Sequence, residues 1–208
     1  DPVYEAQAGE KETDFRSYLL KAKATNPDAL VCSGLVDETV RCLVQSYEVG
    51  IPKSVARVAN SVASKVEVPT NAGKAAVGVS YAAAFAASDT RPIAKDFVKH
   101  IKKRYGVVPG HDFSQMEDLL TMLKPALEKA EKGFSGDLAS DRKAVRDSIA
   151  GITNFTGLAS GPISFCAAGS PECRDGNRTP VMIEYTKGGK NWKTKVAGTV
   201  TFNASAGL

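Results

Sequence analysis

The sequence has no apolar run long enough to cross a membrane. A transmembrane helix needs about 20 consecutive, mostly apolar residues, whereas the best candidate, residues 81–88 (YAAAFAAS), is much shorter. We expect that run to be a buried strand and its exit. The start of the sequence also lacks a basic and apolar leader, so we expect an exported protein with this sequence to be a processed or truncated form with its signal peptide removed.

Side chains and motifs typical of catalysis are scarce. The only two histidines are His100, in a lysine-rich helix, and His111, in a loop, and both are expected to be surface residues rather than general bases. There is no Cys-x-x-Cys pair, phosphate-binding glycine loop or His-Glu-x-x-His motif. The consecutive acids Glu117 and Asp118 point to different faces of a predicted helix, which makes them weak candidates for a catalytic pair. We therefore predict no enzyme, no cofactor and no metal.

The sequence also lacks a strong excess of charge of one sign. Its 27 Lys and Arg against 23 Asp and Glu give a net charge of +4. The one basic cluster, residues 99–104, is interpreted as the solvated face of a helix rather than a contact with nucleic acid or membrane. A chain of 208 residues, 43% of them hydrophobic, is long enough for one large or two small domains with a full core.

Residues 14–60 alternate between helix and strand. The first helix is expected to be capped by Thr13 or Asp14 and to end before Pro27, because the residue before a proline is disfavoured in helical conformation. The apolar run Ala29–Cys32 is typical of a strand covered on both faces. From their spacing, the inward residues of this helix are expected to be Phe15, Leu19, Leu20 and Ala22.

A second helix and strand complete a βαβ unit. The helix is expected to open at Asp37 and to end with Gly50 as a left-handed C-terminal cap, before a weaker strand at residues 55–59. Its inward residues are expected to be Val40, Leu43, Val44 and Tyr47. Ligands of such units gather beyond the carboxyl ends of the strands. The predicted binding site is therefore made of Ser33, Gly34, Leu35, Val36, Asn60 and Ser61.

Further elements are predicted downstream. A loop containing Pro69, Asn71 and Gly73 leads to a strand at about residues 75–81. A helix at 113–132 is expected to kink or break at Pro125 and to bury Leu119, Met122, Leu123, Leu127 and Ala130. The other predictions are helices at Pro92–Tyr105 and 141–149, strands at 162–165 and 199–202, and a hairpin of 181–185 with 192–196.

The four cysteines form two candidate pairs. Cys166 and Cys173 flank a polar turn rich in glycine and proline, and we expect them to form a disulfide, which fits an oxidising compartment. Cys32 ends a strand and Cys42 lies in the helix after it. A bridge between them requires Cα atoms within about 7 Å, so a disulfide and two buried free thiols both remain open.

The order of these motifs resembles the type I periplasmic solute-binding proteins of ABC transporters, in particular the branched-chain amino-acid (leucine/isoleucine/valine) receptors. The resemblance rests on Asp14-Phe15, on Pro27-Asp28-Ala29 and on Gln45 with Gly50, and it continues to the hairpin with Trp192. It implies an α/β fold, a parallel βαβ sheet with flanking helices. Complete receptors have a further half-chain before this point, so it also implies the C-terminal half of an incomplete two-lobed protein.

The resemblance also implies a division of the chain. Residues 1–84 would be the βαβ region of the second lobe, and residues 85–165 would cross the hinge and supply later helices and a strand of the first lobe. Residues 166–208 would form a C-terminal hairpin and tail. Glu117-Asp118 stands where the family often has Tyr-Asp at the start of the helix that faces the first lobe.

The implied function is reversible capture of a small organic solute (an amino acid, an aromatic acid or an amide) in the periplasm, or otherwise outside the cytoplasm, and its delivery to an ABC permease. Amino-acid binders of the family place an aromatic residue after the first strand and a Glu after the next. Here Leu35 and Val36 stand at the first place and Asn60 at the second, so the anion for an α-ammonium group is missing. Two alternatives remain: a ligand-sensing regulatory domain of the same fold, and a fragment that is inactive alone and forms a homodimer.

Overall fold

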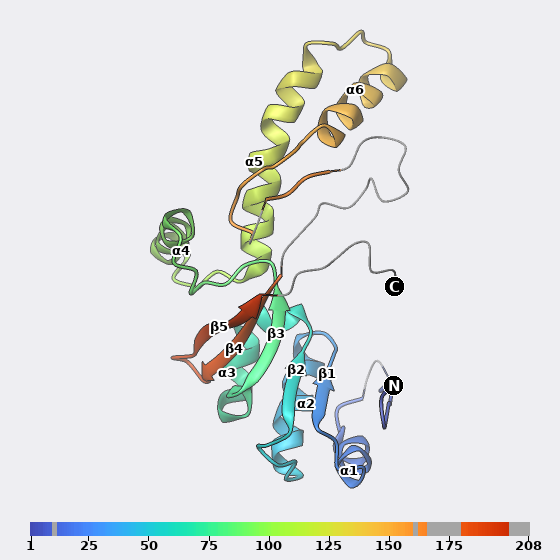
Figure 1. The fold of residues 1–208 in the computed structure, drawn as a ribbon, viewed down its shortest axis with the longest axis vertical. Coiled ribbons are helices and arrows are strands. Elements are labelled where there is room, and N and C mark those ends of the chain that lie inside the picture. The colour runs from blue at the N-terminus through green and yellow to red at the C-terminus, as the bar shows by residue number, and fades with distance from the viewer. Residues whose placement is uncertain (10–11, 160–161, 166–179, 200–208) are drawn as a thin grey trace.

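The computed structural model describes residues 1–9, 12–159, 162–165 and 180–199 (Figure 1). No helix within these ranges is long and apolar enough to span a membrane. In chain order the elements are α1 (Arg16–Ala24), β1 (Ala29–Cys32), α2 (Val36–Glu48), β2 (Ala56–Ala59), the 3₁₀ helix η1 (Ser61–Ser64), α3 (Glu67–Ala72), the 3₁₀ helix η2 (Gly73–Ala76), β3 (Val79–Ala83), α4 (Pro92–Tyr105), α5 (His111–Glu131), α6 (Leu138–Ala150), β4 (Val181–Lys187) and β5 (Lys193–Thr199).

One mixed sheet in the order β1-β2-β3-β4-β5 forms the lower part of the molecule in Figure 1. β1, β2 and β3 are parallel, and the β4–β5 hairpin adds to β3 in antiparallel direction. The predicted βαβ unit and the C-terminal hairpin are confirmed. Cys32 pairs with Ala59, which in turn pairs with Tyr81, so the carboxyl ends of the three parallel strands lie side by side.

The sheet is buried on one face and largely open on the other. The buried face packs with α2, α3 and the 3₁₀ helices around a cluster that includes Leu43, Val68, Tyr81 and Ile183. On the other face, Val31 of β1 is 66% exposed. The expectation that the first strand is covered on both faces is therefore wrong for this chain, because no described helix lies over Val31 and β1 is the edge strand of the described sheet.

Helices α1 and α2 follow the predicted pattern with small differences. Phe15, rather than Thr13 or Asp14, is the N-cap residue of α1, although the Asp14 carboxylate accepts a hydrogen bond from the Arg16 N–H at 3.1 Å. α2 begins one residue earlier than expected, at Val36. Gly50, with φ +71°, is the expected left-handed residue after α2. Phe15, Leu19, Ala22 and Leu43 are buried, Val40 and Val44 are half-buried, and Leu20 and Tyr47, which were expected to face inward, are exposed.

The segment between β2 and β3 is helical, whereas the sequence predicted a loop. It forms η1, α3 and η2, so β3 begins at Val79 rather than near Ala75. Pro69 lies in the first turn of α3, where a missing N–H removes no helical hydrogen bond. Val68, Ala72 and Ala76 recur every four residues and are all buried, which is the helical signal that the proline obscured.

The remaining helices stand apart from the sheet, with α5 and α6 side by side in Figure 1. α4 matches its predicted bounds and ends at Gly106, which is left-handed. α5 is continuous through Pro125, so no break occurs there. The proline and Thr121, whose carbonyl loses its helical partner, are both exposed, so water can satisfy that carbonyl. α6 begins earlier than predicted, where the side chain of Asp137 accepts a hydrogen bond from Ser140 N–H at 2.8 Å.

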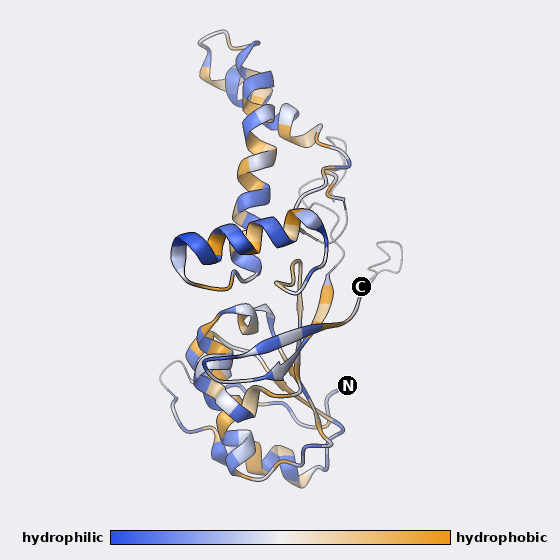
Figure 2. Ribbon diagram, turned by 90° about the vertical axis from the view of Figure 1, so that its left-hand side faces the viewer, coloured by the Kyte–Doolittle hydropathy of each residue, from blue (hydrophilic) through white to orange (hydrophobic). Residues whose placement is uncertain are grey.

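The buried face of α5 differs from the predicted stripe. Its buried residues recur every four positions and are Ser114, Asp118, Met122, Ala126 and Ala130. Leu119 and Leu127, which were expected to be inside, are exposed. The strand predicted at residues 162–165 is reduced to one bridge between Phe155 and Ile163. Figure 2 shows hydrophobic and hydrophilic residues alternating along α4 and α5.

Candidate functional site

The six predicted site residues lie together at the carboxyl ends of β1 and β2. Ser33, Gly34 and Leu35 form the turn into α2, and Val36 is its first residue. Asn60 is the N-cap residue of η1, and Ser61 is its first residue. All six are at least partly exposed, and Leu35 is 72% exposed. They therefore form one open wall rather than an enclosed cavity.

Asn60 joins the two strand ends. Its side-chain Nδ2 donates a hydrogen bond to the carbonyl of Gly34 at 2.9 Å, and the hydroxyl of Thr39 donates to the same carbonyl at 3.4 Å. This contact commits the donor end of the Asn60 amide to the protein. The acceptor end, Oδ1, is buried and has no hydrogen-bond partner among the described residues.

A second unsatisfied oxygen lies beside the same turn. Glu38, in the first turn of α2, has a buried Oε2 that lacks a partner in the described part of the chain. A Cβ added to Gly34 would lie 2.8 Å from the Cβ of Glu38, which shows how closely the two residues approach. Buried oxygens without a donor are uncommon in folded proteins. Two such acceptors, one of them a carboxylate, therefore belong to residues that contact Gly34.

A disulfide fixes this wall to the sheet. Cys32 at the end of β1 is bonded to Cys42 in α2, with the Cα atoms 5.9 Å apart. The alternative of two free thiols is therefore wrong for this pair. The four residues that follow Cys32 are the first four predicted site residues, so the bond closes the loop that carries them. The second predicted disulfide, Cys166 with Cys173, lies outside the described residues.

Two buried tyrosines, Tyr81 and Tyr185, pack next to the residues that follow Asn60. The rings of Tyr81 and Tyr185 have centroids 5.3 Å apart, and the Tyr185 hydroxyl donates a hydrogen bond to the carbonyl of Ala63 in η1. Burial raises the pKa of Tyr81 to about 12 and also raises the pKa of Tyr185. Both rings are therefore neutral near pH 7, and Tyr185 holds the helical turn that follows Asn60.

The acids and histidines considered as weak catalytic candidates do not come together in the structure. Asp118 is buried and accepts hydrogen bonds from the backbone N–H groups of Leu158 (2.7 Å) and Ala159 (2.8 Å), while Glu117 points outward. His100 is exposed as expected. His111 is not a surface residue of a loop: it is the first residue of α5, its side chain is mostly buried, and its Nε2 lies 2.9 Å from Oδ1 of Asp112. Within the described ranges no three His, Cys, Asp or Glu residues gather as metal ligands would.

Sequence reasoning did not single out Glu38. An acid in the first turn of a helix is common because it interacts favourably with the helix dipole, so nothing in the sequence distinguishes Glu38 from its neighbour Asp37. Only the packing of Glu38 against the Gly34 turn places it beside the candidate site residues.

Comparison with known proteins identifies a matching family and similar solved structures. The periplasmic binding protein family signature matches residues 3–174. No curated protein sequence matches the chain. Similar solved structures include a leucine-binding protein of Thermotoga maritima, with 24% identity and a TM-score of 0.73 over 91% of this chain and 49% of that chain. Another is a branched-chain amino-acid substrate-binding protein of Streptococcus pneumoniae in complex with isoleucine, with 22% identity and a TM-score of 0.72 over 92% of this chain and 49% of that chain.

A third similar structure is a solute-binding protein of R. palustris in complex with benzoate, with 16% identity and a TM-score of 0.72 over 92% of this chain and 48% of that chain. The chain thus spans about half the length of these relatives, which are solute-binding proteins. The predicted fold class, α/β and incomplete relative to the relatives, is confirmed. The family signature covers most of the sequence, and the chain belongs to the periplasmic binding protein family, with the type I fold.

Proposed function

We propose that this chain is part of an extracytoplasmic solute-binding protein of an ABC importer, and that the ends of β1 and β2 form one wall of its solute site. Relatives with this fold bind leucine, isoleucine or benzoate. Ligands of parallel α/β sheets bind beyond the carboxyl ends of the strands, where Ser33–Val36 and Asn60–Ser61 lie. Reversible binding there requires no catalytic group.

The pair of unsatisfied acceptors beside Gly34 carries this proposal. One N–H of the Asn60 amide is already bound to the Gly34 carbonyl, and the atom of Asn60 without a partner among the described residues is the acceptor Oδ1. Glu38 adds a carboxylate, and the exposed Asp37 adds a second negative charge to the same turn. The group that faces this wall is therefore a hydrogen-bond donor, such as an ammonium or an amide N–H.

This chemistry bears on the choice among solute classes. The Glu that amino-acid binders use is replaced by Asn60, but Glu38 provides an anion from the neighbouring helix. Both residues are partly exposed, so their side chains lie at the border of the surface that a solute would reach. An amino acid or an amide fits this wall, whereas the carboxylate of an aromatic acid would be repelled by the acidic side chains of Asp37 and Glu38.

The whole cleft needs a second wall. Because the relatives are about twice as long as this chain, we assign residues 1–84 to the second lobe, residues 85–165 to the hinge crossing and later parts of the first lobe, and residues 166–208 to the C-terminal hairpin and tail. Closure of two lobes about a hinge would trap the solute and present it to a membrane permease in the periplasm.

A thermal-shift panel tests the proposal. Leucine, leucinamide and benzoate are added to the chain, because a solute that binds only the native state raises the melting temperature. Leucine and leucinamide are expected to raise it and benzoate is not. Glu38→Gln is expected to weaken the response to leucine, while Asp37→Asn, a matched change in the same helical turn, keeps more of it. A response to benzoate alone, or an equal loss in both variants, would contradict the assignment.

A further inference from the structure

One helix carries the whole net charge of the chain. α4 contains five of the 27 basic residues and, in Asp96, one of the 23 acidic residues. The rest of the chain therefore has 22 of each sign, and α4 accounts for the net charge of +4. Charges of both signs are usually interspersed on a protein surface. The positive charge of this chain is instead concentrated on a single element.

Four of the basic side chains form one stripe along α4, which we call the lysine face. Its residues are Lys95, Lys99, Lys102 and Lys103. At 3.6 residues per turn they fall within an arc of about 100°. All four are exposed, whereas Ala94 and Ile101, on the opposite side of the helix, are buried. Figure 2 shows α4 side-on, on the face of the molecule that is turned to the viewer.

No carboxylate neutralises the lysine face within the part of the chain that the structure describes. None of its four ammonium groups forms an ion pair there. In contrast, Lys65 and Lys143 elsewhere in the chain each pair with an aspartate. The sequence alone favoured a merely solvated face, because it does not show which lysines are paired. The structure leaves all four charges available to an external anion.

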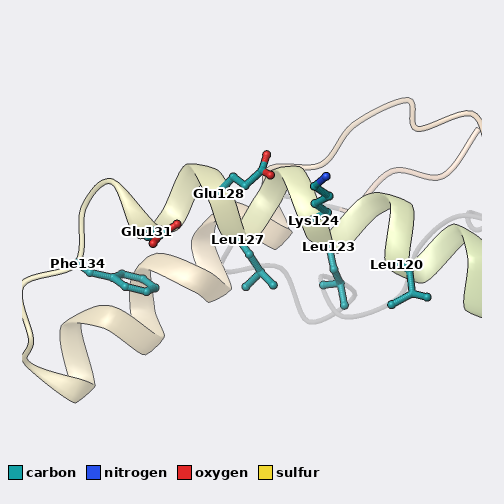
Figure 3. Close-up of a pocket in the computed structure, with 7 residues that line it drawn as sticks. All are labelled: Leu120, Leu123, Lys124, Leu127, Glu128, Glu131 and Phe134. Carbon is teal, nitrogen blue, oxygen red and sulfur yellow. The ribbon is translucent and has the colours of Figure 1, made fainter.

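This face differs in kind from the open face of α5. The groove there has a volume of 470 Å³ and is lined by residues that include Leu120, Leu123, Leu127 and Phe134 (Figure 3). Apolar side chains gain free energy by burial, so that groove suits further polypeptide, such as the relatives' additional length. Burial of four unpaired ammonium groups would instead cost free energy. The lysine face is therefore expected to stay in water in a longer chain as well.

The choice of lysine favours a diffuse anionic partner. An arginine guanidinium binds one carboxylate or phosphate through two parallel hydrogen bonds, whereas a lysine ammonium acts as a point charge. Clusters of four or more basic residues on an amphipathic helix are typical of proteins that bind anionic lipid surfaces. The Cys32–Cys42 disulfide fits an oxidising compartment, which argues against a nucleic acid as the partner.

We propose that the lysine face of α4 binds the anionic headgroups of a membrane surface. The helix presents its four ammonium groups on one side, and a bilayer offers anionic groups over a flat area, so all four can be engaged together. A protein that delivers a solute to a permease works next to such a surface. No residue of the lysine face belongs to the strand ends that we assign to solute, so this binding does not depend on solute.

Cosedimentation of the 208-residue chain with lipid vesicles tests the proposal. The vesicles contain phosphatidylcholine with about 30% phosphatidylglycerol, and vesicles of phosphatidylcholine alone are the neutral comparison. The chain is expected to bind the anionic vesicles only. Binding should be lost when NaCl is raised from about 0.1 M to about 1 M, because the Debye length falls from about 10 Å to about 3 Å.

Substitutions test whether the lysine face is responsible. Each lysine near an anionic membrane contributes about fivefold to the association constant, so Lys99→Gln with Lys103→Gln should lower that constant about 25-fold. The matched control, Lys124→Gln with Lys129→Gln, removes the same charge from exposed positions of α5 and should change it by less than about twofold. Lys99→Arg with Lys103→Arg keeps the charge and should keep the affinity. Circular dichroism checks that each variant is folded.

Three kinds of result would overturn the proposal. A chain that does not bind the anionic vesicles at low salt would leave the lysine face to another partner, such as an acidic protein surface. Equal binding to neutral vesicles, or loss of binding in the arginine variant, would show that charge is not the cause. An equal loss in the two glutamine variants would assign the binding to the net charge of the chain rather than to α4.

Discussion

Reduction of the Cys32–Cys42 disulfide is expected to destabilise the protein measurably. The two cysteines are ten residues apart in sequence, and the loop-entropy relation gives about 2.7 kcal/mol for a loop of that length at 25 °C. For a chain of this size, 1 kcal/mol changes the melting temperature by about 2 to 4 °C. Reduction should therefore lower the melting temperature by roughly 5 to 11 °C.

The assay is differential scanning calorimetry with and without dithiothreitol. Cys166 and Cys173 are changed to Ser in all samples, so that only one pair can respond. The control adds Cys32→Ala and Cys42→Ala, and its melting temperature should be the same in both conditions. If the parent also melts at the same temperature with and without reductant, the bond does not restrict the unfolded chain enough to change stability, and the reasoning from loop entropy fails.

Three further outcomes follow from the packing of particular residues. Asp118→Ala should destabilise the protein by roughly 2 to 4 kcal/mol in urea unfolding, because two buried backbone N–H groups lose their acceptor; Glu117→Gln, at the exposed neighbouring position, should have almost no effect, and equal effects would contradict this. Burial raises the pKa of Tyr81 from 10.0 to about 12, so its contribution to stability is fully present below pH 10 and is lost as pH rises from 10 to 12. Urea unfolding between pH 10 and 12 should show that the free energy of unfolding falls less in Tyr81→Phe than in the wild type. If the two proteins lose stability equally with pH, Tyr81 is not the titrating group. Gly34→Ala should lower the free energy of unfolding by about 1 to 3 kcal/mol, because the added Cβ would contact α2 closely. Gly9→Ala is the control and should be neutral, since no atom lies within 4 Å of its added Cβ. A neutral Gly34→Ala would show that the turn can shift.

Local sequence signals predicted the elements whose ends are set by local chemistry. α4 could be bounded correctly because Pro92 occupies its first turn and Gly106 ends it in a left-handed conformation. The first βαβ unit was recognisable from apolar spacing and from Gly50. In contrast, Pro69 suggested a loop in a segment that is helical, because a proline in a first helical turn gives no sign of the turns that follow.

Strand pairing between distant segments and the choice of buried helix face depend on tertiary packing, and the sequence did not predict them. The sequence predicted the C-terminal hairpin but not that β4 would pair with β3, since that contact joins residues about a hundred positions apart. It also predicted one buried stripe on α5, where the structure has one buried and one open apolar face. Which leucines are covered depends on the neighbouring elements, and apolar spacing alone does not identify them.

The sequence predicted that the candidate site residues lie together, but it did not predict their hydrogen bonds. The rule for parallel strand ends located Gly34 and Asn60 correctly as neighbours. It did not indicate that the Asn60 donor would be used by the Gly34 carbonyl, because the direction of an amide depends on contacts across two strands. Glu38 was missed for a related reason, since an acid in a first helical turn is ordinary until its packing is known.

Amide chemical-shift mapping by NMR tests the central claim most directly. The ¹⁵N-labelled chain is titrated with leucine, leucinamide and benzoate, and the position of the response is recorded. Our account predicts that leucine and leucinamide shift the backbone signals of residues 33–36, 38 and 60–61, and that benzoate leaves them in place. Shifts confined to other parts of the chain, or a response at these residues to benzoate alone, would contradict it.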